Sequence, residues 1–305
     1  MRSEGPTTTN VGYKIICGVV GSAGSDRALD FVAALPMRPR DEVIVASRPA
    51  YLFAARANGE GIIARASEAA RDRAHVNVDA GAVRLAAKGV SARGIVCDGE
   101  DPVEALIGLA EDEHASLIVV GSRGLGPWTS IVLGSTARAL AITCPVPVLI
   151  VREHAVAPLR ILAAADGSPS ARAALAAFAC MPQSEGAVVE LLHVLPMHEW
   201  PKSKVDWDEI GDRTDVERDE EQRSEAMLEA QRRLLPAGLE VRTRHERGHV
   251  GETILRRADE IGADLLVIGT RGLEGPRDLF YGSTAERVLT QTHANVLVGA
   301  AVAGS

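Results

Sequence analysis

The sequence lacks the features of membrane, exported and disulfide-stabilised proteins. None of its apolar runs approaches the ~20 residues that are needed to span a bilayer, and no basic segment followed by an apolar one precedes residue 13. The four cysteines contain no C-x-x-C pair, which favours small buried side chains in a reducing compartment. We therefore expect a cytoplasmic protein with no membrane partner.

Positive charge and aromatic side chains are also scarce. The net charge is −8, and aromatic residues make up only 3% of the chain. An open nucleic-acid surface needs clustered lysine and arginine, and single strands need aromatic stacking platforms. These two shortages argue against a nucleic-acid partner. The 305 residues, with 46% hydrophobic content, suffice for about two domains with their own cores.

Strand-like and helix-like segments alternate along the chain. In the first half we expect strands near residues 15–20, 43–45, 94–97, 117–120 and 146–151, separated by helices near 26–35, 66–88, 102–113 and 136–142. In the second half we expect strands near 159–165, 188–194, 239–245, 265–268 and 295–299. This alternation predicts an α/β fold with two tandem doubly wound domains, each a five-stranded parallel sheet with helices on both faces.

One glycine pattern occurs twice, at positions that lie 148 residues apart (121 and 269). Gly121-Ser122-Arg123-Gly124 is followed after nine residues by Gly134-Ser135-Thr136, and Gly269-Thr270-Arg271-Gly272 is followed after nine by Gly282-Ser283-Thr284. Because the strands repeat in the same order at nearly the same offset, the chain is an internal duplication. We place its domains at residues 13–153 and 158–300, after a flexible tail at residues 1–12.

Each glycine pattern follows an apolar strand and precedes a helix. Glycine lets backbone N–H groups approach a ligand closely, and the free N–H groups of a helix start favour an anion. The nine-residue spacing leaves a loop that can close over a phosphate chain. The alternative is a well-capped helix that needs no ligand, because Ser283-Thr284-Ala285-Glu286 fits a capping box.

Asp166 follows the first strand of the second half. It lies at the carboxyl edge of the expected sheet, where open parallel sheets bind their ligands. A carboxylate there can accept a hydrogen bond from a ribose hydroxyl or a base amino group. Its alternative role is that of an N-cap or turn residue before the next helix, and the two roles are compatible.

These residues resemble the nucleotide motif of the universal stress protein family. The spacing G-2x-G-9x-G-(S/T) is matched by Gly121, Gly124, Gly134 and Ser135, and again by Gly269, Gly272, Gly282 and Ser283. The family's Asp-Gly-Ser after strand one is matched by Asp166-Gly167-Ser168, and its Pro-Val before the last strand by Pro145-Val146. The chain therefore resembles a tandem member of the family's ATP-binding branch, from about Lys14 to Val298.

The resemblance implies a binding site for ATP, which a magnesium ion can accompany. It implies adenine and ribose near Asp166 and Val194, and phosphates on the loop from Gly269 to Gly272 and at Gly282-Ser283-Thr284. Glu274 and Asp278 lie inside the second nine-residue loop and would repel phosphate if they pointed inward, and Arg271 or Arg277 would offset that repulsion. The resemblance also implies that the domains pair through their fifth strands, within the chain or between the chains of a homodimer.

Two departures from the family pattern change these expectations. In the first half, Val20 stands where the family has its aspartate, so we expect that site to be weak, altered or empty. Its remaining candidates are Gly21, Ser22, Gly121, Arg123, Gly124, Gly134, Ser135 and Thr136. In the second half, residues 292–296 replace the Pro-Val ending, so pairing at that edge is the part of the resemblance that the sequence supports least.

No catalytic residue can be assigned. The chain has no Walker motif, Ser168 has no identifiable catalytic partner, and we expect His193 to be a core histidine with a satisfied hydrogen bond. His245 and His249 lack a third metal ligand and are expected to be solvated. Residues 197–224, with Trp200, Trp207 and a charged run, are expected to form a solvated loop and helix face, the alternatives being a lid or a partner-binding segment.

The expected function is that of an ATP-binding, nucleotide-responsive stress regulator. Two alternatives stay open: an interaction module that works without nucleotide, and a slow ATP hydrolase.

Overall fold

The computed structural model describes residues 12–49, 60–99, 101–122, 133–152, 156–195, 197, 213–270 and 282–300. The first half contains, in order, β1 (Lys14–Gly18), α1 (Ala23–Ala34), β2 (Glu42–Ser47), α2 (Glu60–Ala86), β3 (Ala92–Val96), α3 (Pro102–Asp112), β4 (Leu117–Gly121), α4 (Ser135–Thr143) and β5 (Val148–Val151). The second contains β6 (Arg160–Ala164), α5 (Pro169–Cys180), β7 (Val188–Leu195), α7 (Arg213–Arg232), β8 (Glu240–Arg247), α8 (Val250–Ile261), β9 (Leu265–Ile268), α9 (Ser283–Gln291) and β10 (Asn295–Val298).

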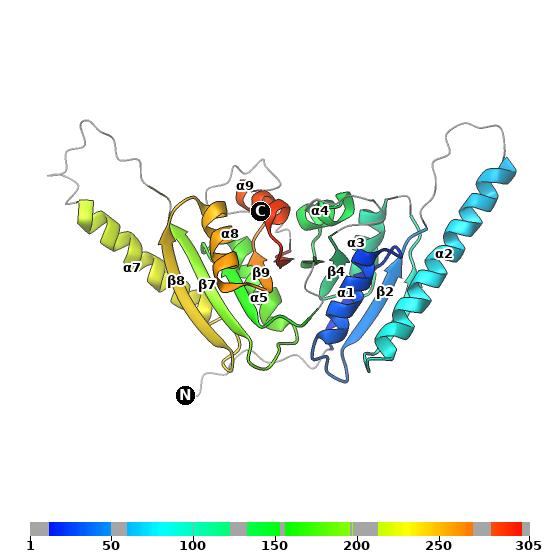
Figure 1. Cartoon of the computed structure of the whole chain (residues 1–305), viewed down its shortest axis with the longest axis horizontal. Coiled ribbons are helices and arrows are strands. Elements are labelled where there is room, and N and C mark those ends of the chain that lie inside the picture. The colour runs from blue at the N-terminus through cyan, green and yellow to red at the C-terminus, as the bar shows by residue number, and fades with distance from the viewer. Residues whose placement is uncertain are drawn as a thin grey trace.

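All ten of these strands form one continuous sheet in the order β3-β2-β1-β4-β5-β10-β9-β6-β7-β8. Each half is parallel throughout, as the alternation of strands and helices predicts. The halves meet at the antiparallel pair of β5 and β10, where Leu149 lies opposite Leu297. Figure 1 shows the halves side by side, with α4 and α9 near the centre and α2 and α7 at the outer ends. Pairing through the fifth strands therefore occurs within the chain.

Pairing at the edge near residues 292–296 had the least support from the sequence, yet β10 pairs there with β5. Asn295 occupies the place that Pro147 has in the first half, and it is fully buried at the start of β10. Its side-chain Oδ1 accepts a hydrogen bond from the backbone N of Arg152, which directly follows β5, at 2.8 Å. An amide side chain thus ties the two edges together without the Pro-Val ending.

Two apolar layers cover the sheet, one on each face. The first contains Phe31 of α1 and Phe178 of α5, with Val78 of α2 and Leu228 of α7 at its flanks. The second contains side chains of α3, α4, α8 and α9, among them Leu106, Leu140, Ile254 and Val288. Each layer runs through both halves without interruption. The central strands are buried on both faces and therefore read as continuous apolar runs.

The cysteine prediction holds for three of the four residues. Cys17, Cys97 and Cys144 are buried, whereas Cys180 is exposed at the end of α5. Burial raises the pKa of the Cys17 thiol to about 12 and that of Cys144 to about 11, so both stay protonated near neutral pH. Among the described helices, none is long and apolar enough to cross a membrane.

The charged segment after β7 is partly described. Its run from Asp215 to Glu221 lies on α7, which agrees with a solvated helix face. Trp200 and Trp207 lie outside the described residues, as does the tail up to residue 11, so neither prediction can be compared with the structure.

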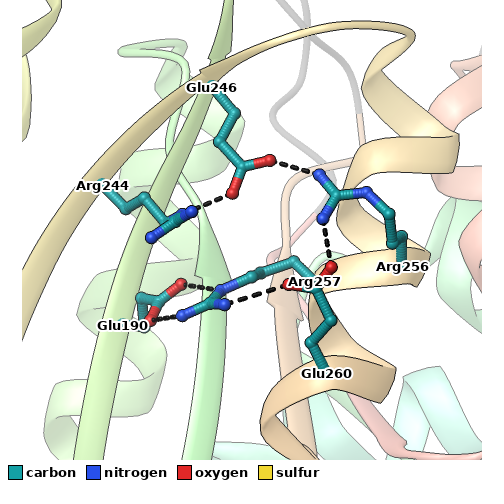
Figure 2. Close-up of polar contacts among 6 residues, drawn as sticks. All are labelled: Glu190, Arg244, Glu246, Arg256, Arg257 and Glu260. Atoms are coloured by element: carbon teal, nitrogen blue, oxygen red, sulfur yellow. Dashed lines mark hydrogen bonds and ion pairs between the residues drawn. The ribbon is translucent and has the colours of Figure 1, made fainter.

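Six charged side chains link β7, β8 and α8 in the second half (Figure 2). They alternate in sign along the chain of contacts Arg244–Glu246–Arg256–Glu260–Arg257–Glu190. This polar network anchors α8 over the outer part of the sheet.

Candidate functional site

The carboxyl ends of β6 and β9 bring the predicted site residues together. The two strands are parallel neighbours, with Ala163 opposite Val267, so the segments that follow them leave the same edge of the sheet. Asp166 follows β6, and Gly269 follows β9. Contact between these segments is close, because a Cβ on Gly269 would lie 2.5 Å from Ser170 Oγ.

Asp166 and Ser168 both stabilise the turn that leads into α5. Asp166 Oδ1 accepts from the backbone N of Ser168 at 2.9 Å, and Ser168 Oγ caps α5 by accepting from Ala171 N at 3.1 Å. Gly167 adopts φ = +77°, a left-handed conformation that favours glycine. The turn role of Asp166 is confirmed, and the capping role belongs to Ser168. Oδ2 of Asp166 accepts no hydrogen bond within the described part of the chain and remains available to a ligand.

The first glycine of each motif copy is required by packing. A Cβ on Gly269 would lie 2.7 Å from Ala171 N, and one on Gly121 would lie 2.4 Å from Gly24 O. Both glycines thus let the end of a strand touch the first turn of a helix. This role needs no ligand, and spacing in the sequence did not indicate it.

Each nine-residue loop is closed at its base by a backbone hydrogen bond. Gly282 N donates to Thr270 O at 3.1 Å, and Gly134 N donates to Ser122 O at 2.8 Å. The helix start is therefore fixed beside the strand end in both copies. The loop residues themselves, including the candidates Arg123, Gly124, Arg271 and Gly272 and the acidic Glu274 and Asp278, lie outside the described residues.

Both helices after the loops begin without a side-chain cap. The N-cap residues are Gly134 for α4 and Gly282 for α9, and among the described residues no side chain makes a capping hydrogen bond to either helix. The capping box that Ser283-Thr284-Ala285-Glu286 offered as an alternative is therefore wrong, because the helix starts one residue earlier than that motif requires. Ser135 and Ser283 are exposed, and Thr136 and Thr284 are half-buried beside them. These uncapped N–H groups and the helix dipole favour an anion.

Glu286 lies in the first turn of α9, where its charge would oppose an anion. Its carboxylate instead pairs with Arg138 of α4 across the centre of the molecule. The ion pair offsets this negative charge at the start of α9.

His193 lies near Asp166, at the edge of the candidate site. From the sequence we expected it only to be a core histidine. It is half-buried near the end of β7, and its Nδ1 lies 2.7 Å from Ser224 Oγ on α7. Burial lowers the pKa of His193, while the nearby charge of Asp166 opposes that shift. The prediction of a satisfied histidine is confirmed. The next residue, Val194, is buried in the core layer on the opposite face, so its side chain packs internally.

The first half keeps the turn and lacks the carboxylate. Gly21 adopts φ = +68°, close to the value at Gly167. Val20 is 45% exposed, and its backbone N donates to Ser25 Oγ at 2.9 Å. Ser22 Oγ caps α1. Asn77 of α2 lies beside the turn, because a Cβ on Gly21 would be 2.6 Å from its Oδ1. Sequence reasoning missed Asn77, which lies 56 residues away within a long helix.

The sequence profile of the universal stress protein family matches residues 12–152 and again residues 159–299. The chain belongs to the universal stress protein family. It is a tandem member, because the profile matches each half separately.

Relatives of this universal stress protein carry the same family name. A universal stress protein of Mycolicibacterium smegmatis is 26% identical over 197 residues, which cover 61% of this chain and 62% of that protein. Universal stress protein YxiE of Bacillus subtilis is 41% identical over 69 residues, which cover 23% of this chain and 46% of that protein. These matches span less than two thirds of either relative.

Solved structures agree with the fold. A universal stress protein from Archaeoglobus fulgidus superposes with a TM-score of 0.63, at 23% identity, over 95% of this chain and 98% of its own. At that identity the similarity supports the fold of this chain and carries no information about its ligand or activity.

The universal stress protein domains show no metal centre in the described residues, where no group of three histidine, cysteine or acidic side chains is close enough to hold an ion. His249 is the exposed N-cap residue of α8, and His245 lies half-buried on β8. The exposure of His249 agrees with the expectation of a solvated side chain, whereas His245 is only partly exposed.

Proposed function

We propose that the second domain binds an adenine nucleotide, ATP, and that binding regulates a stress-response partner in the cytoplasm. The observation that carries the proposal is the convergence of Asp166 with the uncapped start of α9, through the paired strands β6 and β9. Family membership and the complete glycine motif between Gly269 and Ser283 support it. The domains would extend over residues 13–153 and 158–300.

In this proposal the phosphates lie at the start of α9. Backbone N–H groups there, together with the exposed hydroxyl of Ser283, would donate to phosphate oxygens. Hydrogen bonds to charged groups contribute about 1.5–3 kcal/mol each, so a few of them suffice for micromolar binding. Arg271 and Gly272 would complete the loop, and a magnesium ion would be held mainly by the phosphates themselves.

The ribose and base would lie along the edge toward β7. Oδ2 of Asp166 makes no hydrogen bond to the described residues and is suited to accept from a ribose hydroxyl or an amino group. His193 adds a neutral imidazole near this carboxylate. The first domain offers Val20 in place of the carboxylate, so we propose that it binds nucleotide weakly or not at all.

Regulation requires that nucleotide bind two states of the protein unequally. Helix α9 connects the proposed phosphate site to the first domain, because Glu286 of its first turn pairs with Arg138. A shift of α9 on binding would therefore reach the contact between the domains.

One observation favours an interaction module that works without nucleotide. Gly121 and Gly269 are both explained by close packing against helices, which any partner-binding scaffold would also need. Mass spectrometry of small molecules extracted from the purified chain separates the two functions. A stoichiometric adenine nucleotide in the extract excludes the scaffold alternative.

Titration calorimetry with ATP tests the proposal on the full chain. Asp166→Ala should weaken binding by roughly 10- to 100-fold, the equivalent of one hydrogen bond to a charged group. Val20→Ala, at the same position of the other copy, is the matched control and should bind as the wild type does. Equal binding by both variants would remove Asp166 from the site, and absence of binding by the wild type would refute the proposal.

A further inference from the structure

The seam between the two domains includes two contacts whose side chains differ between the copies. We define the seam as β5, β10 and the helices that flank them, α4 and α9, with Arg152 directly after β5. Arg138 of α4 and Glu286 of α9 are equivalent residues of the duplication, 148 positions apart, and they form an ion pair with each other. Equivalent residues that touch must straddle the pseudo-twofold axis that relates the domains.

This position distinguishes unlike from like pairing. If two first domains paired through the same surface, Arg138 would face a second Arg138. If two second domains paired, Glu286 would face a second Glu286. Only a first domain against a second domain places opposite charges at the axis.

At a buried contact of the seam, the first domain supplies both hydrogen-bond donors and the second domain supplies both acceptors. The backbone N of Arg152 donates to Asn295 Oδ1 at 2.8 Å, and its guanidinium Nη2 donates to the backbone O of Leu289. Both Arg152 and Asn295 are buried, with exposed fractions of 4% and 0%. Both of these hydrogen bonds run from the first domain to the second.

The equivalents of these residues lack the required groups. At an offset of 148, Arg152 corresponds to Ala300 and Asn295 to Pro147. Two paired second domains would keep a backbone N–H at Ala300 for Asn295 Oδ1, but they would lack the guanidinium that donates to the backbone O of Leu289. Two paired first domains would bring the backbone N of Arg152 to Pro147, which offers no side-chain acceptor. An unsatisfied buried polar group is costly, so both like pairs are disfavoured.

We propose that the seam is a recognition surface for the opposite domain only. Its partner is the second domain of the same chain or the second domain of another copy of this chain. Two chains can therefore associate through the seam only by reciprocal exchange, in which each first domain pairs with the other chain's second domain. The proposal stands on the described contacts and does not depend on nucleotide binding.

Two single charge reversals in the full chain test this directly. Arg138→Glu places two carboxylates together at the axis of one chain, and Glu286→Arg places two guanidinium groups together at the axis of the other. When the two variants are mixed and refolded, reciprocal exchange creates one seam with both native residues and one seam with both substituted residues. Opposite charges then meet at both seams. In an exchanged dimer made of only one of the variants, like charges still face each other at both seams.

Native mass spectrometry reads out the mixture. We expect the mixed dimer to exceed its statistical share over the two same-variant dimers by roughly threefold or more, the effect of two exposed ion pairs. The double variant Arg138→Glu/Glu286→Arg restores the pair within one chain and should behave as the wild type. When it is mixed with the wild type, reciprocal exchange places like charges at both seams, so we expect fewer mixed dimers than the statistical share. Pairing of like domains would instead place opposite charges together and give an excess of mixed dimers, which would overturn the proposal. If a single variant folds poorly alone, co-expression with the other should rescue it.

Two further results would overturn the proposal. The first is a mixture that contains no excess of mixed dimer while the single variants stay folded. The second is a single variant that forms dimers as readily as the mixture does, because such dimers would accept like charges at the axis. Failure of co-expression to rescue a poorly folded single variant counts against the proposal in the same way.

Discussion

Glu190 of β7 and Arg257 of α8 form a bidentate ion pair, with Nε–Oε1 and Nη2–Oε2 distances of 2.6 Å and 2.7 Å. Glu190 also raises the pKa of the Arg257 guanidinium through these hydrogen bonds. The equivalent residues of the first domain are Ile44, which is fully buried, and Leu109, which packs against the same core layer. A charged pair thus fills a site that the duplicated copy fills with aliphatic side chains (Figure 2).

Removing one partner should be more harmful than replacing both. Arg257→Ala leaves the buried carboxylate of Glu190 without its main partner and should lower the free energy of unfolding by about 2–4 kcal/mol. The double variant Glu190→Ile/Arg257→Leu copies the first domain and should be neutral or stabilising. Urea unfolding of the full chain measures both. A double variant as unstable as Arg257→Ala would show that the pair cannot be replaced by apolar packing.

His193 should make the protein less stable in mild acid. In the unfolded chain, histidine takes up a proton near pH 6.5, whereas burial lowers the pKa of His193 in the fold. Below pH 6.5 the unfolded state therefore binds more protons, and the free energy of unfolding falls until the pH passes the folded pKa. His193→Gln should flatten this part of the curve in denaturant titrations from pH 7.5 to 5. An unchanged slope would mean that another group is responsible.

Gly269→Ala should destabilise the fold whether or not nucleotide is present. The added methyl group would lie 2.5 Å from Ser170 Oγ and 2.7 Å from Ala171 N, and overpacking of this kind costs about 1–3 kcal/mol. Gly108→Ala is the control, because a methyl group added to that helical glycine would have nothing within 4 Å and alanine favours helix. Thermal unfolding without ligand compares the two. A fully stable Gly269→Ala that loses only ATP binding would assign the glycine to the ligand instead.

Val20→Asp should create or strengthen a nucleotide site in the first domain. The turn there already has the required backbone, since φ is +68° at Gly21 and +77° at Gly167. The exposed position of Val20 accepts a carboxylate without the cost of burial. Calorimetry should show more ATP bound per chain than in the wild type. If stoichiometry and affinity stay unchanged, the first domain lacks more than its carboxylate.

Local patterns explain why much of the fold is predictable. The sequence predicts strand β9 at residues 265–268, where it is observed, because a short apolar run bounded by polar residues leaves little ambiguity. Pairing of β5 with β10 inside the chain could be expected only through the family resemblance. Asn295 gave no signal, because its partner Arg152 lies 143 residues away.

The site is less predictable than the strands. The capping box does not form, because Gly282 is the N-cap residue of helix α9 and Glu286 forms an ion pair with Arg138. Packing of Gly269 on α5 and the place of Asn77 beside Gly21 both depend on how distant elements meet. Spacing identifies which residues can reach a sheet edge, and only tertiary contacts decide which of them are already occupied.

We propose that one adenine nucleotide binds each chain, at Asp166 and the start of α9. Native mass spectrometry of the full chain during an ATP titration measures this occupancy. We expect a single ATP adduct that fills first, and an Asp166→Ala chain that remains largely free at the same concentration. A wild-type chain that stays free of nucleotide throughout the titration would contradict it.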